Sequence, residues 1–302
     1  ENILKRTQEV DSLEAEIEDL QATVNDPKRI RKIIIGELTE VRKKYAVPRR
    51  TDILYEYEAE NAQGEEDDTP DYPVHLFLSR EGYLKKITPQ SLRMASDQKY
   101  KEGDGPFLYW EGNNRDELLV FTDRQQCYKT RLSEFDDSKA SVLGDYLPTK
   151  LGMDGEERVL WACIPGDYSG QLLFCFENGK TARVELSAYQ TQTRRKKLTG
   201  AYSDKSPLVT AFLLREELEL ALYSSDGRCM VFHTAVLAPK TTRTTQGVNV
   251  MALKPKRTVT QVLPLAETAI VNTARYRARS LPVAGAILRE EDRGEKQLSL
   301  LE

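Results

Sequence analysis

The stretch Leu76-Phe-Leu-Ser-Arg-Glu-Gly-Tyr-Leu-Lys-Lys-Ile87 has the pattern of a β-hairpin: an apolar strand, a polar turn, and a basic strand with alternating character. Three later stretches repeat this form, namely Leu118–Leu132, Leu172–Val184 and Leu220–Phe232. Two of them contain Asn178-Gly179 and Asp226-Gly227, dipeptides typical of tight hairpin turns. The sequence therefore predicts one kind of hairpin, used four times.

The hairpins recur at a nearly constant interval. Their predicted turns lie at Gly82, Gln126, Gly179 and Gly227, which are 44, 53 and 48 residues apart. A period near fifty residues with one hairpin per repeat is typical of a propeller-like array, because a single hairpin cannot bury both of its faces. We expect a mainly β, propeller-like fold. A β-sandwich is the structural alternative, although it would not require a periodic hairpin.

The N-terminal part is predicted to be helical. Apolar residues spaced three and four apart form the seam of a coiled coil: Val10, Leu13, Ile17, Leu20 and Val24. Asn25-Asp26-Pro27 interrupts the pattern, since Asp26 can cap a helix and Pro27 fits a first helical turn. A second helix follows and ends before Pro48, with one stripe formed by Ile30, Ile34, Leu38, Val41 and Tyr45.

Four regions follow from these patterns. We expect a helical arm and hinge over 1–50, an acidic linker over 51–72, a propeller-like β domain over 73–288 and a charged tail over 289–302. Residues 53–72 carry eight acidic side chains and no basic one, which is typical of a poorly ordered loop.

Composition narrows the class of protein. The 302-residue chain has no apolar run near the ~20 residues of a membrane span and no visible signal peptide, so we expect a cytoplasmic protein with no membrane partner. It starts without Met in the middle of a helical pattern, which predicts a fragment of a longer protein. The four cysteines are widely spaced and are interpreted as buried free thiols: Cys127, Cys163, Cys175 and Cys229.

No catalytic pattern is visible. Phosphate-binding loops and nucleophile elbows are missing, and the two histidines, His75 and His233, lie far apart in sequence. We therefore expect no catalytic residue, no metal site and no cofactor in this chain. A propeller-type hydrolase with Asp136 and Asp137 as its acids stays open as a weaker alternative.

Basic residues are concentrated in a few segments, although the chain as a whole is acidic. The net charge is −4, yet residues 240–279 contain eight Lys or Arg and one Glu. Because local cations decide phosphate binding, we predict duplex DNA as a partner, bound by solvent-facing outer strands. The candidate DNA-binding residues are Lys85, Lys86, Lys129, Arg131, Lys180, Arg183, Arg194, Arg195, Lys196, Lys197, Arg228, Arg243, Lys254, Lys256 and Arg257.

Several of these motifs resemble one family. The blade-like stretches are Gly82–Ile87, Phe121–Lys129, Leu173–Ser187, Asp226–Arg228 and Thr242–Val248, and a hinge follows the helices at Tyr45, Arg49, Arg50 and Thr51. Their order resembles the A subunit of bacterial type IIA topoisomerases (DNA gyrase and topoisomerase IV), from the end of its coiled arm into its C-terminal DNA-wrapping domain. The resemblance covers nearly the whole chain, and it implies a β-pinwheel of about five blades in a nucleoid-associated protein.

The resemblance implies a function and a set of partners. The chain would bind and bend duplex DNA to present the transported segment, while the catalytic tyrosine lies upstream of the resembling part. ATP, Mg²⁺, an A-subunit homodimer and an ATPase B-type subunit would belong to the parent enzyme. The gyrase box, Gln-Arg-Arg-Gly-Gly-(Arg/Lys)-Gly, is not recognisable in Leu92–Gly103, which favours a topoisomerase IV-like parent.

A propeller-type protein-interaction module without DNA binding is the main alternative. The acidic net charge is its best support. Salt-dependent binding of DNA would separate the two hypotheses, because only phosphate contacts release counterions.

Overall fold

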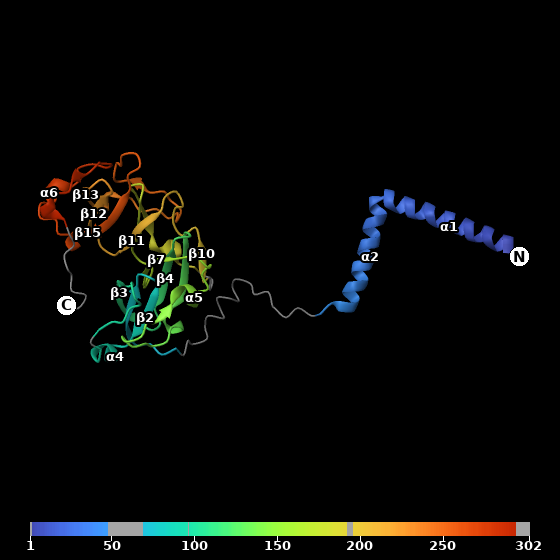
Figure 1. Ribbon diagram of the computed structural model, residues 1–302, viewed down its shortest axis with the longest axis horizontal. Helices are drawn as coiled ribbons and strands as arrows, with labels where there is room; N and C mark the ends of the chain where they lie inside the picture. The colour runs from blue at the N-terminus through green and yellow to red at the C-terminus, as the bar shows by residue number, and fades with distance from the viewer. Residues whose placement is uncertain (1, 48–68, 96, 192–195, 294–302) are drawn as a thin grey trace. The chain divides into compact units, whose positions relative to one another are not determined.

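The computed structural model describes residues 2–47, 69–95, 97–191 and 196–293. The chain separates into two compact units, Glu1–Glu66 and Asp67–Glu302. The first contains two α-helices and the second contains four β-sheets (Figure 1). Within the described ranges, no helix is both long enough and apolar enough to cross a membrane.

The helical unit confirms the predicted break. α1 (Asn2–Asn25) and α2 (Pro27–Tyr45) meet at Asp26, whose carboxylate accepts a hydrogen bond of 2.9 Å from the backbone N–H of Lys28. Pro27 occupies the first turn of α2, where its missing N–H would have no helical partner. The apolar seam side chains of both helices are exposed, from Val10 to Tyr45.

The β unit is built from four four-stranded sheets, here called blades 1 to 4. In sheet order, their strands are β3 (Pro106–Asn113), β1 (Pro73–Ser79), β2 (Tyr83–Ile87) and β6 (Asp145–Tyr146) in blade 1; β7 (Val159–Cys163), β4 (Glu117–Thr122), β5 (Gln126–Arg131) and β10 (Lys197–Thr199) in blade 2; β11 (Leu208–Leu214), β8 (Gln171–Phe176), β9 (Lys180–Glu185) and β14 (Val248–Asn249) in blade 3; and β15 (Val259–Pro264), β12 (Glu219–Ser224), β13 (Arg228–His233) and β16 (Ala286–Ile287) in blade 4.

Short helical turns connect these strands. They are α4 (Pro89–Arg93), η2 (Leu132–Glu134), α5 (Leu147–Lys150), η3 (Leu186–Tyr189), η4 (Thr234–Val236), η5 (Leu265–Glu267), α6 (Thr273–Tyr276) and η6 (Glu290–Asp292). The four predicted hairpins are confirmed as the central strand pairs β1–β2, β4–β5, β8–β9 and β12–β13.

The first three blades are interlocked. β6 pairs with β2, although the complete hairpin β4–β5 of blade 2 lies between them in sequence. In the same way, β10 follows the hairpin of blade 3 and completes blade 2, and β14 follows the hairpin of blade 4 and completes blade 3. Each of these blades therefore borrows its last strand from beyond the hairpin of the next blade.

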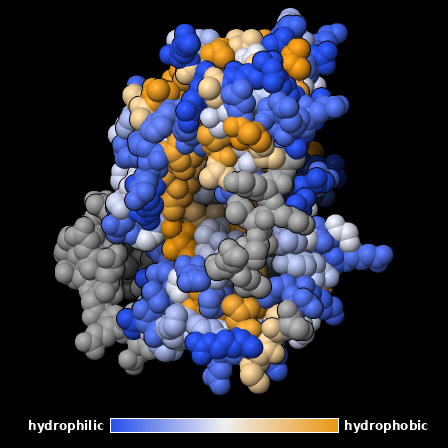
Figure 2. Space-filling model, turned by 90° about the vertical axis from the view of Figure 1, so that its left-hand side faces the viewer, coloured by the Kyte–Doolittle hydropathy of each residue, from blue (hydrophilic) through white to orange (hydrophobic). Residues whose placement is uncertain are grey.

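The blades stand side by side with their inner strands together. β11 lies against both β7 and β15. The first strand of each sheet, in the order given above, therefore faces the middle of the array. The opposite edge strands, β6, β10, β14 and β16, form the outer rim. Buried clusters fill the spaces between the blades, and Figure 2 shows apolar surface between hydrophilic borders on one side of the molecule.

The predicted fold class, mainly β and propeller-like, is confirmed, but the described residues form four blades rather than about five. After β15 the chain forms η5 and α6 instead of another hairpin, and β16 then pairs with β13. Tyr276 of α6 packs with Ala221, Cys229 and Val231 on the last blade. The segment between β15 and β16 lacks the strand–turn–strand pattern, so it covers blade 4 and begins no fifth sheet.

Left-handed residues close the four hairpins. Gly82, Gly179 and Gly227 have φ values of 90°, 78° and 72°, and Gln125 has φ 53° in blade 2. The turn residue of blade 2 is thus Gln125, one position before the predicted Gln126, which is the first residue of β5. Glycine adopts this conformation without steric cost, whereas glutamine does not.

Candidate nucleic-acid interface

The predicted solvent-facing position of the basic hairpin strands is wrong for three residues. Lys85, Lys86 and Arg183 are only 1%, 3% and 8% exposed. The second strand of each hairpin is a central strand of its sheet, since a fourth strand pairs with the first residues of its outer edge. Neighbouring blades and loops then cover its two faces, so these cations point into the protein.

Aligning the hairpins on their turns explains why basic residues recur. Lys86, Lys129 and Arg183 fall at the same strand position in blades 1, 2 and 3, and Val231 falls there in blade 4. Each of the three cations contacts the segment that leads into the following blade. We call these contacts blade clamps.

The first clamp joins blade 1 to blade 2. The ammonium of Lys86 donates to Oδ1 of Asn114 at 2.7 Å and lies 3.2 Å from the carboxylate of Asp137. Asn114 precedes the hairpin of blade 2, and Asp137 follows it. Asp137 also accepts a hydrogen bond from the hydroxyl of Tyr72. The carboxylate proposed as an acid in the hydrolase alternative is therefore bound to two side chains of the protein.

The second clamp joins blade 2 to blade 3. Lys129 Nζ lies 3.1 Å from Glu117 Oε2 and 5.1 Å from the ring centre of Tyr168, a cation–π distance. Tyr168 lies between β7 and β8 and donates its hydroxyl to Glu117 at 2.7 Å. One carboxylate therefore holds both the lysine and the tyrosine.

The third clamp joins blade 3 to blade 4. The guanidinium of Arg183 donates to Glu217 Oε1 at 2.6 Å, and to the carbonyl oxygens of Thr234 and Leu237 at 3.0 and 3.2 Å. Hydrogen bonding from Arg183 lowers the pKa of Glu217, and the hydroxyl of Thr234 adds to this effect. No hairpin follows blade 4 in the described part of the chain, and the equivalent residue there is the apolar Val231.

Acid should weaken the third clamp. The lowered pKa of Glu217 means that its stabilising contribution is present above the ordinary carboxyl pKa and is lost as the pH falls through the folded-state value. We expect Glu217→Gln to lower stability at pH 7 and to flatten the fall in stability below about pH 4.5. Urea unfolding at pH 7 and at about pH 3.5 measures this. An unchanged pH dependence would contradict the assignment.

Lys85 occupies a cage of neutral acceptors. Its ammonium donates to Gln98 Oε1 at 3.0 Å and to the carbonyl oxygens of Lys99 and Ala140 at 2.6 and 3.1 Å, with the ring centre of Tyr100 at 4.9 Å. Burial lowers its pKa. Three of these contacts come from the stretch 92–103, where the gyrase box would stand.

The remaining candidates lie nearer the surface. Arg131, Lys196, Lys197, Lys254, Lys256 and Arg257 are exposed or nearly so, and Lys129, Lys180, Arg228 and Arg243 are partly exposed. Arg228 is held by Asp226 and by the carbonyl oxygen of Gly285, and Arg243 donates to the carbonyl oxygen of Ala188. Arg194 and Arg195 lie outside the described residues.

Three lysines, Lys180, Lys196 and Lys197, lie on or beside neighbouring rim strands; they are here called the rim cations. Lys197 opens β10, the outer strand of blade 2, and Lys196 directly precedes it. Lys180 opens β9 opposite Asn249 of the outer strand of blade 3, and its ammonium donates to Gln246. Gly200, which follows β10, lies close to Thr244, which precedes β14. The outer strands of blades 2 and 3 are therefore neighbours on the rim.

Carboxylates only partly balance the rim cations. Lys196 is 78% exposed and lies 3.6 Å from Glu134, and Lys197 lies 3.3 Å from Asp154. Hydrogen bonding with Tyr128 and Asp154 raises the pKa of Lys197, so its ammonium keeps its charge. The rim strands of blades 1 and 4, Asp145–Tyr146 and Ala286–Ile287, contain no basic residue. On the rim strands themselves, positive charge is thus concentrated at blade 2.

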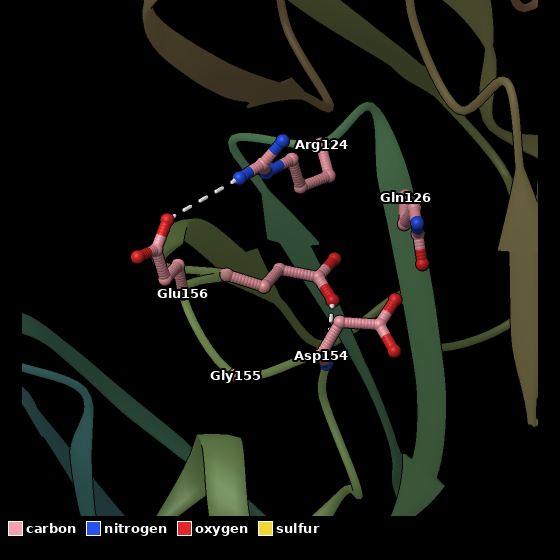
Figure 3. Close-up of a pocket in the computed structure, with 6 residues that line it drawn as sticks. Arg124, Gln126, Asp154, Gly155 and Glu156 are labelled. Carbon is pink, nitrogen blue, oxygen red and sulfur yellow. Dashed lines mark hydrogen bonds and ion pairs between the residues drawn. The ribbon is translucent and has the colours of Figure 1, made fainter.

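An acidic depression borders the rim cations. It is lined by Arg124, Gln126 and the loop 154–157, and Figure 3 shows Arg124 reaching toward Glu156, 3.9 Å away. Glu157 is buried and accepts hydrogen bonds from Tyr128 and from the hydroxyl of Thr122. The carboxylates of this loop repel phosphate, so a nucleic acid on the rim would avoid this side of blade 2.

The structure offers no support for chemistry at cysteines or metals. All four cysteines are free and buried, and burial raises the pKa of Cys175 and of Cys229 to about 12. Among the described residues, no group of three or more His, Cys, Asp or Glu is placed to hold a metal ion.

Sequence reasoning missed the partners of the blade clamps. Asn114, Glu117, Tyr168 and Glu217 lie in or beside connections with no motif of their own. The only signal was the recurrence of a cation at one hairpin position, and that signal has two interpretations: a surface belt or an internal contact.

The four sheets, of which the first three are interlocked, define the β unit as a β-pinwheel. No protein-family model matches the chain. The chain is related in sequence to the A subunit of DNA topoisomerase 4 from Bacillus subtilis, with 28% identity over 198 residues, covering 64% of this chain and 24% of the relative. It is also 22% identical over 298 residues to the A subunit of DNA topoisomerase 4 from Staphylococcus epidermidis, covering 97% of this chain and 37% of that protein.

A solved structure has the same fold. The crystal structure of the C-terminal domain of DNA topoisomerase IV superposes with a TM-score of 0.63 at 22% identity, covering 72% of this chain and 73% of that chain. The resemblance to type IIA topoisomerase A subunits is therefore confirmed. The chain spans about a quarter to somewhat over a third of the length of the curated relatives named above.

Proposed function

We propose that the β unit binds duplex DNA through its outer rim, as the C-terminal domain of a type IIA topoisomerase A subunit. The rim cations on two adjacent blades are the observation that carries this proposal. Lysines on or beside edge strands can reach phosphates without reading bases, which suits binding of little sequence preference. Bending the duplex across two neighbouring blades would help to present the transported segment.

The parent enzyme is proposed to be topoisomerase IV-like. The stretch 92–103 supplies α4 residues and the acceptors that surround Lys85, and contains a single glycine, so it is unsuited to act as a glycine-rich basic loop. In this proposal the parent works in the cytoplasm as an A-subunit dimer together with a B-type ATPase. The partner complex uses ATP and Mg²⁺, and the present chain contributes DNA binding.

The dependence of DNA affinity on salt concentration tests the proposal. We expect the whole 302-residue chain to bind a linear duplex in a gel-shift series with an affinity that falls steeply as salt rises, because each neutralised phosphate releases about 0.9 counterion. Replacing Lys180, Lys196 and Lys197 together by Gln should reduce the slope of log K against log salt by roughly 2 to 3.

The matched control replaces three cations away from the rim cations, Arg80, Lys101 and Lys139, by Gln. This variant has the same change in net charge and should retain most of the slope. A response to salt that is flat for the unmodified chain would favour the protein-interaction alternative. A strong preference for one DNA sequence would contradict backbone binding.

A further inference from the structure

One loop recurs beside each hairpin turn and can be compared between blades. The backbone N–H groups of Arg80, Asp123, Glu177 and Ser225 donate to the carbonyl oxygens of Gly105, Arg158, Pro207 and Thr258, respectively. These four bonds are equivalent: each joins the start of a hairpin turn to the loop that leads into the inner strand of the same blade. We call these loops the turn-side loops.

The charge of the turn-side loops changes sign around the array. The loop 101–105 of blade 1 has one cation and two carboxylates, and the loop 154–158 of blade 2 has one cation and three carboxylates. In blade 3, Asp204 and Lys205 neutralise each other at 3.4 Å. The loop of blade 4, Lys254-Pro-Lys-Arg-Thr258, has three cations and no carboxylate.

The three cations of blade 4 are presented to solvent on a fixed turn. Lys254, Lys256 and Arg257 are exposed, and within the described ranges none of them lies within 4.0 Å of a carboxylate, although the charge of Arg257 contributes to lowering the pKa of Asp226. The N–H of Arg257 donates to the carbonyl oxygen of Lys254 at 3.0 Å, which closes a four-residue turn. The loop is anchored to blade 3 through Val259 and Glu177, and to blade 4 through Thr258 and Ser225.

Lys256 has an unfavourable backbone conformation. Its φ is 62°, in the left-handed region, and it follows Pro255 at the turn position that favours glycine. The left-handed conformation is energetically unfavourable for lysine, because of its Cβ, and is not unfavourable for glycine. Strained backbone conformations are concentrated at functional sites.

We propose that the turn-side loop of blade 4 is a second phosphate-binding site for duplex DNA, away from the outer rim. This inference rests on the proposed function and extends it. The duplex follows the rim at blades 2 and 3, where the acidic loop of blade 2 keeps it away from the turn side. It then crosses to the turn side between blades 3 and 4, where Lys254, Lys256 and Arg257 receive it.

The substitution Lys256→Gly tests this site because binding and stability should change in opposite directions. Affinity of the whole chain for a linear duplex at low salt should fall roughly fivefold, and the slope of log K against log salt should decrease by about 1. The melting temperature should stay the same or rise, because glycine relieves the strain. Lys256→Arg retains the charge and should retain the affinity.

The matched control is Lys205→Ala, in the equivalent loop of blade 3, where the lysine is already paired with Asp204. We expect it to leave the salt slope nearly unchanged. If Lys256→Gly binds as tightly as the unmodified chain, or if Lys205→Ala weakens binding equally, the site is refuted while the rim proposal stands. If the unmodified chain does not bind DNA, both proposals fail.

Discussion

Replacing Arg183 by methionine should lower the free energy of unfolding of the β unit by about 3 kcal/mol, because buried carbonyls and a carboxylate lose a charged donor. Its guanidinium joins blade 3 to Glu217, Thr234 and Leu237 of the next blade. For a domain of this size, such a loss lowers the melting temperature by roughly 6–12 °C. Thermal and urea unfolding measure it directly.

Lys180→Met provides the control on the same strand. Lys180 opens β9 three residues earlier, is partly exposed and forms no ion pair with a described residue, so its replacement should change stability by about 0.5 kcal/mol or less. DNA binding should show the reverse order, with Lys180→Met weaker and folded Arg183→Met nearly normal. If Arg183→Met kept full stability and lost DNA binding, Arg183 would be a DNA contact and the clamp would be wrong.

Replacing Gly179 by alanine should be more damaging than the same change at Gly227. Both glycines close hairpins with positive φ, and that conformation alone costs an alanine about 1–2 kcal/mol. A Cβ at Gly179 would also lie 2.3 Å from the carbonyl oxygen of Met251, whereas a Cβ at Gly227 would meet nothing within 4 Å. We therefore expect a loss of at least about 3 kcal/mol at Gly179.

The contrast tests the interlocking of the blades. Met251 follows β14, the strand that blade 3 borrows from beyond the hairpin of blade 4, and the carbonyl oxygen of Gly179 accepts hydrogen bonds there from Val250 and Met251. Urea denaturation of the two alanine variants gives the two losses in free energy. Equal losses at both positions would mean that the borrowed segment does not pack on the turn of blade 3.

Local patterns in the sequence were sufficient for the hairpins and the helix break. Asn178-Gly179 and Asp226-Gly227 specify tight turns by themselves, and Asp26-Pro27 specifies the start of a helix. The period between turns then indicates a stacked array, because each hairpin needs a neighbour. These features depend on residues that are adjacent in the chain.

The burial of the basic residues depends on residues far apart in the chain. Lys86 lies inside because segments far along the chain cover β2. β6 pairs with Tyr83 and Leu84, the stretch 137–138 pairs with the backbone of Lys86, and Asn114 accepts a hydrogen bond from its ammonium. A two-residue strand such as Asp145–Tyr146 has no detectable periodicity, so the sequence alone could not reveal it. Lys196 and Lys197 are exposed, as a short run of cations in the sequence favours, because such runs are seldom buried.

The borrowed strands also fix the order in which the domain can be completed during synthesis. At about 5–20 residues per second, the 58 residues from the end of β2 to the start of β6 take roughly 3–12 seconds to emerge from a ribosome. Throughout that interval the backbone of β2 has an open edge that could pair with another nascent chain. Blades 2 and 3 are completed with a similar delay, because β10 begins 66 residues after the end of β5 and β14 begins 63 residues after the end of β9. Each of the first three blades is therefore complete only after the hairpin of its successor has been made.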